Sequence, residues 1–391
     1  METAAFEKDK PGKLVRTAQG YWAFVPNRLP PDLELTWEFV NQISEADRRL
    51  SELAGAARTL PNPHLLIEPF TRREAVLSSR IEGTVASLSD LMSFEALGVV
   101  HPDRPDVAEV ANYVTALEYG LSRLTKLPVS TRLMRELHER LMRGTRGEHM
   151  IPGEFRRSQN WIGPPGCLLK DASFVPPPEA EMKEALSDLE KYIHSESKLP
   201  PLVRMALIHY QFEAIHPFLD GNGRIGRLLI TLLLCAEGLL PQPLLYLSAF
   251  FERHRSQYYR LLLEVSQQGN WQEWITFFLC GISEQSVDAL NRANQLQQLS
   301  LEYRQMLHGK RSSATLLQMA DLLFKNPVFS PSSISKALKI TYVSAQKNID
   351  KLVNAGILRE TTGRQRGRIY VAQRVIEILE KRDARQMRLK L

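Results

Sequence analysis

The 391-residue sequence has few of the features that mark secreted or membrane proteins. Its three cysteines, Cys167, Cys235 and Cys280, are widely spaced and form no CxxC pattern. This argues against a disulfide framework or a zinc site and is typical of a reducing compartment. The charged start, METAAFEKDKPGK, lacks an apolar signal core, and the most apolar run, LLITLLLCAEGLL, contains Glu237 and is too short to span a bilayer. We therefore expect a cytoplasmic protein without membrane contact.

Strand-favouring segments are sparse before residue 357, and there is no internal repeat or low-complexity tract. Most segments from residue 32 onward place apolar residues at helical spacing, which predicts a mainly α fold. Residues 69–84 predict a short helix with Thr71 as N-cap and Gly83 at its end. By contrast, residues 1–32 read as irregular, and residues 152–182, rich in Gly and Pro, predict a hairpin or loop.

Charge is unevenly distributed along the chain. Residues 311–391 contain sixteen Lys or Arg and six Asp or Glu, a net charge of +10, whereas the whole chain carries +6. The first 310 residues therefore carry −4 by difference. The basic tail needs an explanation of its own, and a merely solvated surface is the simplest alternative.

The segment IHPFLDGNGRIGR, residues 215–227, concentrates several chemical groups in one short stretch. Gly221 and Gly223 permit positive φ, so the segment predicts a tight loop between two helices. Free N–H groups at the start of the second helix would bind an anion. Arg224 and Arg227, three residues apart, share one face of that helix, and two guanidinium groups beside an anion site predict a polyphosphate ligand.

Three further side chains complete this predicted site. Asp220 is the local carboxylate for Mg²⁺, which commonly accompanies polyphosphates. His216 is a candidate general base near neutral pH, and Phe218 is expected to anchor the loop in the core. Each feature alone is common in purely structural loops, but their conjunction predicts a functional site.

The motif HPFLDGNGRIGR resembles the signature of Fic-domain proteins at every fixed position. HYQFEAI and YLSAFFERHRSQYYRLL are also similar to that family, and the resemblance covers about residues 15–375. It implies a mainly α fold: a helical Fic core with a small β-hairpin flap, plus a C-terminal winged-helix domain. The expected domains are a Fic_N segment with an inhibitory helix at 1–100, a catalytic core at 101–300 and a winged helix at 301–391.

The resemblance further implies transfer of AMP from ATP to a Ser, Thr or Tyr hydroxyl of a target protein, including the chain itself. His216 would deprotonate the hydroxyl, and Asp220 would hold Mg²⁺ across the α- and β-phosphates. Such transfer depends mainly on positioning and electrostatic stabilisation, which this loop can supply. The phosphates would be contacted by the remaining loop residues: Gly221, Asn222, Gly223, Arg224 and Arg227.

Two other segments would complete the nucleotide site by the same resemblance. The predicted hairpin or loop would be a flap that aligns the target by strand pairing, with Trp161, Ile162 and Gly163 near the nucleotide. Tyr258 and Tyr259 match a pair of tyrosines near the base. The structural alternatives are an ordinary surface hairpin and a helical pair that belongs to the core.

SSRIEG, residues 78–83, matches an inhibitory pattern of the family through Ser78, Glu82 and Gly83. A glutamate at the end of a helix can pair with an arginine. Pairing of Glu82 with Arg227 would deny that arginine to the γ-phosphate of ATP, so the resemblance implies an enzyme that is autoinhibited in cis. The alternative is an exposed Glu before a helix-capping Gly.

Residues 330–372 predict a helix, a turn, a second helix and two strands, which is the order of a winged helix. Ser330 caps the first helix and Thr341 the second. The second helix would enter the major groove of duplex DNA while the wing contacts phosphates. A module for protein contacts or dimerisation is the alternative. The expected DNA contacts are Tyr342, Ser344, Gln346, Lys347, Arg364, Arg366 and Arg368.

Three functions are compatible with these patterns. The first is an autoinhibited protein adenylyltransferase that uses ATP and Mg²⁺, and the intact motif with both arginines favours it. The second is a DNA-binding regulator whose Fic core senses nucleotide, and the third is a Fic enzyme that transfers another phosphate-containing group. The sequence names neither the target protein nor the DNA site, and a homodimer is compatible with it.

Overall fold

The computed structural model describes residues 1–7, 11–59, 64–98, 106–145, 148–164, 166–308, 313–363 and 367–381. It is mainly helical, as the sequence predicted. The helices are α1 (Trp37–Thr59), α2 (His64–Ile81), α3 (Leu88–Leu97), α4 (Asp106–Arg123), α5 (Thr131–Met142), α6 (Glu179–His194), α7 (Pro201–Ile215), α8 (Asn222–Ala236), α9 (Ser248–Arg253), α10 (Arg255–Gln268), α11 (Trp271–Met306), α12 (Ala314–Lys325), α13 (Pro331–Leu338), α14 (Tyr342–Asn354) and α15 (Gln373–Glu380). The strands are β1 (Gly12–Arg16), β2 (Trp22–Pro26), β3 (Val328–Phe329), β4 (Arg359–Glu360) and β5 (Tyr370–Val371).

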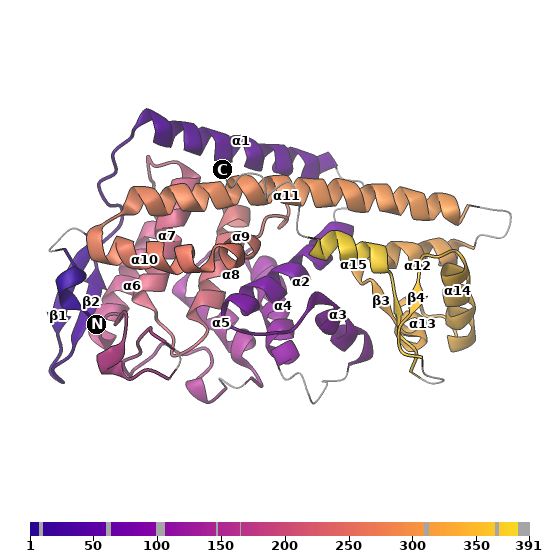
Figure 1. Ribbon diagram of the computed structural model, residues 1–391, viewed down its shortest axis with the longest axis horizontal. Helices are drawn as coiled ribbons and strands as arrows, with labels where there is room; N and C mark the ends of the chain where they lie inside the picture. Colours follow the sequence, from indigo (N-terminus) through magenta and orange to yellow (C-terminus); the bar gives the residue numbers. More distant parts are fainter. Residues whose placement is uncertain are drawn as a thin grey trace.

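The long helix α11 runs along the molecule with α1 beside it (Figure 1). The β1–β2 hairpin lies at one end of the molecule, and the unit formed by α12 to α15 lies at the other. With 36 residues, α11 is about 54 Å long at 1.5 Å per residue. Within the described part of the chain, no helix combines the length and apolarity needed to cross a bilayer.

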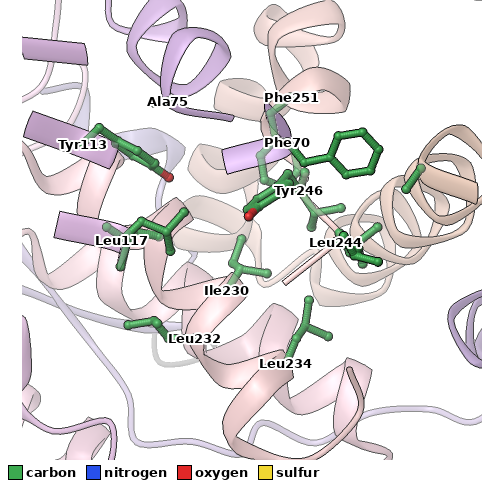
Figure 2. Packing of buried hydrophobic residues seen from close by; sticks show 14 of the residues in the cluster. Phe70, Ala75, Tyr113, Leu117, Ile230, Leu232, Leu234, Leu244, Tyr246 and Phe251 are labelled. Carbon is green, nitrogen blue, oxygen red and sulfur yellow. The ribbon is translucent and has the colours of Figure 1, made fainter. Parts of the chain in front are cut away.

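The central helices α7 and α8 are buried on most sides, because their sequences are apolar nearly all round. Figure 2 shows part of this packing, in which Phe70 of α2, Leu117 of α4, Ile230 of α8 and Tyr246 belong to one buried cluster. A core packed in this way deforms little. The loop that joins α7 to α8 is therefore held on a rigid base.

The prediction that residues 1–32 are irregular is wrong. They contain the antiparallel hairpin β1–β2, in register from Gly12 opposite Pro26 to Arg16 opposite Trp22. An isolated two-stranded hairpin is marginally stable, but this one gains a long-range contact, because the Phe24 N–H donates to the Val175 carbonyl at 2.9 Å.

Helix α2 begins at His64, so the predicted N-cap at Thr71 is also wrong. Thr71 lies inside the helix, is 1% exposed and shares a hydrogen bond with the Tyr246 hydroxyl at 2.9 Å. The additional turns hold Leu66 and Phe70 in the core, and this tertiary packing outweighs the helix-breaking tendency of the intervening proline.

The C-terminal unit follows the order of elements predicted for residues 330–372. Ser330 caps α13 and Thr341 caps α14 through their side-chain oxygens. The strands form an antiparallel sheet in the order β3–β5–β4. The unit packs against α2 through α12 and α15, and Lys325 Nζ lies 2.6 Å from Glu68 Oε1. Its position is therefore coupled to that of α2.

Candidate active site

The candidate active site is the loop between α7 and α8. Helix α7 ends at His216, which adopts a left-handed backbone with φ of 49°, and α8 begins after Gly221, whose φ is 77°. A side chain at Gly221 would be strained and would press on Met142 Sδ. At Gly223, in the first turn of α8, a Cβ would collide with the Glu82 carboxylate. The glycines therefore allow both the turn and a close approach to the α8 backbone.

Asn222 shapes this loop from within. Its Oδ1 accepts a hydrogen bond from the Phe218 N–H and its Nδ2 donates to the Phe218 carbonyl, both at 2.8 Å. The side chain is 2% exposed and both of its polar atoms close the turn, so a phosphate contact of Asn222 would come from its backbone N–H and stays a prediction. Phe218 is fully buried and stacks on the His138 ring with centroids 3.9 Å apart, which confirms it as the anchor of the loop.

The His216 imidazole is arranged as a free base. Its Nδ1 lies 3.2 Å from the Glu213 carbonyl oxygen. A carbonyl can only accept, so Nδ1 carries the proton and Nε2 keeps its lone pair. Burial lowers the pKa of His216 to about 4, so the ring is neutral at pH 7. A neutral ring with an unprotonated Nε2 can accept a proton from a hydroxyl group.

Asp220 and Arg224 border the start of α8 and fit a magnesium–polyphosphate ligand. Asp220 Oδ1 accepts a hydrogen bond from the Gly221 N–H at 2.6 Å, yet 52% of the side chain is exposed, so a carboxylate oxygen remains accessible. Arg224 is 5% exposed, and its Nε has no hydrogen-bond partner among the described residues. A buried donor without a partner is costly and would be satisfied by a phosphate oxygen. A carboxylate is also the ligand type that Mg²⁺ prefers.

The predicted contact between Glu82 and Arg227 is present. Arg227 Nη2 lies 2.6 Å from Glu82 Oε1 and 3.0 Å from the Ser78 carbonyl, and Arg227 Nε donates to Ser78 Oγ at 2.9 Å. Burial would raise the pKa of Glu82, but the Arg227 charge outweighs it and lowers that pKa. Burial would likewise lower the pKa of Arg227, and Glu82 raises it instead. The pair is therefore ionic, and it directs Arg227 toward α2. Gly83 follows Glu82 with φ of 97° and closes the turn after α2.

Three residues that support this loop escaped the sequence analysis. Arg156, 2% exposed, donates through Nε to the His216 carbonyl at 2.9 Å, and Asn160 Nδ2 donates to the Phe218 carbonyl at 2.8 Å. His138 accepts the Gly153 N–H at Nδ1, so its Nε2 carries the proton and donates to the Asp220 carbonyl at 3.0 Å. These three donors fix the carbonyl groups of the loop in place.

Two buried carboxyl groups near the inhibitory helix were also missed. Burial raises the pKa of Glu213 to about 8, with Arg227 opposing the effect, and Glu213 Oε1 has no hydrogen-bond partner in the described part of the structure. Glu74 accepts hydrogen bonds from the Tyr113 hydroxyl and from Ser248, which fasten α2 to α4 and α9, and burial raises its pKa to about 7. No local pattern marks either residue in the sequence.

The predicted flap is a loop with a single bridge rather than a regular hairpin. Ile162 pairs with Phe174 through an N–H donated each way, at 2.8 and 3.1 Å. Pro164, which has no N–H, and Gly166 disfavour further pairing among the described residues of this segment. Trp161 and Ile162 are 40% and 38% exposed, and Gly163 packs closely against Cys167.

The two tyrosines of the predicted pair face different surroundings. Tyr258 is 1% exposed, its ring packs on Phe251 at 4.5 Å, and its hydroxyl shares a hydrogen bond with His209 Nε2 at 2.8 Å. It therefore packs in the core, and its expected place near the nucleotide base stays a prediction. Tyr259 is 40% exposed and close enough to Glu82 for that charge to raise its pKa, after the larger effect of burial. Tyr259 is the more accessible of the two tyrosines.

The expected DNA contacts divide between α14 and the segment between β4 and β5. Tyr342, 54% exposed, and Lys347 face solvent, Ser344 is half-buried, and Gln346 Nε2 donates to the Tyr370 hydroxyl at 3.1 Å. The Gln346 amide therefore already has a hydrogen-bond partner inside the C-terminal unit. The expected wing residues are Arg364 and Arg366, which lie outside the described residues, and Arg368, which bonds to Tyr370.

Comparison with known proteins agrees with this site. Residues 40–122 match the Fic/DOC family N-terminal domain (Fic_N), and residues 128–234 match the Fic/DOC family domain (Fic). The chain is 30% identical over 186 residues to the protein adenylyltransferase Fic of Drosophila erecta, an alignment that covers 46% of this chain. It spans about a third of the length of the curated relatives it matches (33% for this one).

Two solved structures share the fold at low sequence identity. A Fic family protein from Desulfovibrio desulfuricans is 21% identical, with a TM-score of 0.55, over 88% of this chain and 98% of that chain. A Fic domain containing signaling protein from Bacteroides thetaiotaomicron is 20% identical, with a TM-score of 0.51, over 64% of this chain and 95% of that chain. With its signature loop, its two matched domains and this shared helical fold, the chain belongs to the Fic/DOC family.

Proposed function

We propose that this chain transfers AMP from ATP to a hydroxyl group of a target protein and that Glu82 restrains the reaction. The observation that supports this proposal is the convergence of a neutral His216, an accessible Asp220 carboxylate and the guanidinium groups of Arg224 and Arg227 at the start of α8. Transfer of a phosphorus-centred group needs a base, a positioned polyphosphate and charge stabilisation, and this loop provides a candidate for each.

In the proposed reaction, His216 Nε2 accepts the hydroxyl proton as the oxygen attacks the α-phosphorus of ATP. The bond from that phosphorus to the bridging oxygen of the β-phosphate breaks, and pyrophosphate leaves. Arg224 donates its buried, unsatisfied Nε–H to the polyphosphate. Asp220 would hold Mg²⁺, which neutralises phosphate charge when bound. Arg227 reaches the γ-phosphate only after it leaves Glu82.

The proposal is tested by incubating the full chain with ATP and Mg²⁺ and measuring intact mass. A gain of one AMP in the Glu82→Gly variant, absent from Glu82→Gly/His216→Ala, supports it. A gain of one phosphate instead identifies transfer of another phosphate-containing group. Lack of any modification in Glu82→Gly, on the chain itself or on supplied protein acceptors, contradicts enzymatic transfer and favours a nucleotide sensor.

A DNA-binding role is a second candidate, supported by the order of elements in the C-terminal unit. The order of α12, β3, α13, α14, β4 and β5 is compatible with a winged helix, and Tyr342 and Lys347 are exposed on α14. Retention of duplex DNA by the full chain should fall with salt and weaken in Lys347→Gln. Lys183→Gln, exposed on α6, is the matched control. Salt-insensitive retention, or none, favours a protein-contact module.

A further inference from the structure

A basic cavity lies on the face of α2 that points away from the catalytic loop. Its volume is about 510 Å³, within the usual range for small-molecule sites. Ser78 and Glu82 leave α2 on the opposite side, where they bind Arg227. Four residues of α2 at helical spacing line the cavity: Arg73, Val76, Leu77 and Arg80. The helix that carries the inhibitory glutamate is thus bordered by the catalytic loop on one side and by this cavity on the other.

Basic side chains outnumber acidic ones in the cavity wall, and they come from helices distant in the sequence. The basic residues are Arg73 and Arg80 of α2, Arg253 of α9, Arg292 of α11 and Lys381 after α15. The acidic residues are Glu252 of α9 and Glu380 of α15.

Two arginines share one carboxylate at the floor of the cavity. Arg292, 5% exposed, binds Asp288 through Nε and Nη2 at 2.7 Å each, and Arg73 Nη1 lies 3.4 Å from the same carboxylate. Burial lowers the pKa of Arg73 to about 10, and Arg292 adds to this effect. Behind these arginines, Gln285 is 2% exposed, and its Nε2 lacks a hydrogen-bond partner among the described residues. Two guanidinium groups therefore share one carboxylate at the floor, and Arg292 also donates to the carbonyls of Ile378 and Lys381.

Another part of the wall already accommodates an anionic group. Burial raises the pKa of the Glu380 carboxyl group, and the Arg80 charge and the backbone N–H of Leu88, the first residue of α3, oppose that effect. No carboxylate of a described residue lies within 4.0 Å of the Arg80 guanidinium. A helix start beside an arginine is favourable for a phosphate group as well.

We propose that this cavity binds a small metabolite bearing one or two phosphate groups. The ligand holds α2 in the inhibitory position, in which Glu82 binds Arg227. The cations of the cavity belong to α2, α9, α11 and the end of α15. A bound dianion favours the conformation in which these cations are together, which is the one where Glu82 holds Arg227. This regulatory effect rests on the proposed function, whereas the binding itself does not.

Fructose 1,6-bisphosphate is a suitable probe, because it carries two phosphates but no base or triphosphate for the catalytic loop. Calorimetry with the full chain should show one bound equivalent. Arg80→Gln/Arg253→Gln should raise the Kd at least about tenfold, since charge-assisted contacts are lost. Lys381→Gln, on the exposed rim, should raise it several-fold and serves if the double variant does not fold. The matched control, Arg260→Gln, removes an exposed charge on α10 and should leave the Kd unchanged.

Hydrogen–deuterium exchange of residues 73–82 separates this proposal from the catalytic one. The probe should slow exchange there in the wild type and equally in His216→Ala, which needs no transfer activity. It should also lower AMP labelling of the wild type but not of the Arg80→Gln/Arg253→Gln variant. Absence of binding, or binding lost only in Arg224→Gln, overturns the cavity as a phosphate site. Binding of the probe without slower exchange in α2 overturns the proposed effect of the ligand on the inhibitory contact between Glu82 and Arg227.

Discussion

Replacing Glu82 with Gly tests how strongly this residue restrains Arg227. The Arg227 side chain is 1% exposed and lies 2.6 Å from Glu82 Oε1, but 36% of the Glu82 side chain is open to solvent, which weakens the attraction. A hydrogen bond to a charged group contributes about 1.5–3 kcal/mol. With this exposure we expect the lower part of that range, about 1.5–2 kcal/mol, which corresponds to roughly a 10–30-fold increase in the rate of transfer.

The assay is the initial rate of AMP incorporation at saturating ATP and Mg²⁺. Glu82→Gln keeps the shape of the side chain without its charge and should also release the enzyme; release by Gly alone would mean that Glu82 blocks the site sterically. Arg227→Ala should lower transfer in both backgrounds, so the double variant should resemble Arg227→Ala. Equal rates for the wild type and Glu82→Gly would refute the reasoning and leave SSRIEG as no more than a helix end.

Three further predictions concern the buried groups around the loop. His216→Ala should abolish AMP incorporation yet leave ATP affinity by calorimetry nearly unchanged, because the imidazole acts on the hydroxyl; substantial residual labelling would remove it as the base. In the Glu82→Gly enzyme, kcat/KM should stay level from about pH 8 to about 5.5, because the pKa of His216 is about 4 and its protonation begins only below this window; a half-loss near pH 6.5 would contradict a buried neutral ring. Glu213→Gln should raise the free energy of unfolding at pH 7 by about 1–3 kcal/mol and by less at pH 5, since the Glu213 carboxyl keeps its proton up to a pKa of about 8 when folded but only to about 4.5 when unfolded. Urea unfolding measures this, with exposed Glu273→Gln as the control, and a pH-independent difference would contradict it.

The catalytic loop was predictable because its groups are contiguous in the sequence. His216 and Arg227 are separated by one turn and one helix start, and the spacing of the glycines between them defines the backbone. The supporting residues were not predictable in this way. His138 bonds to a backbone carbonyl 82 residues away and Arg156 to one 60 residues away, and such donors leave no local pattern.

Errors in the secondary structure have the same origin in tertiary contacts. Helix α2 was predicted too short because Thr71 was assigned as its N-cap, yet buried neighbours keep the first turns folded in spite of Pro69. Tyr258 looked like a ligand contact from its position beside Tyr259, but its hydrogen-bond partner, His209, lies 49 residues earlier. The asparagine of the signature, Asn222, has its partner only four residues away, and still the sequence alone did not show which way its amide points.

The two hydrogen bonds that Arg227 donates to Ser78 have a consequence for how fast the restraint on Arg227 can be released. When Glu82 turns away, Arg227 can keep its bonds to the Ser78 hydroxyl and carbonyl. Release therefore requires the rotation of one partly exposed side chain, a motion of picoseconds to nanoseconds, and no helix has to unfold. Restraint of this kind is a rapid equilibrium, in which a constant fraction of molecules has Arg227 released from Glu82. Any change in the Glu82 rotamer or in the position of α2 alters this fraction, and with it the rate of transfer, in a graded way.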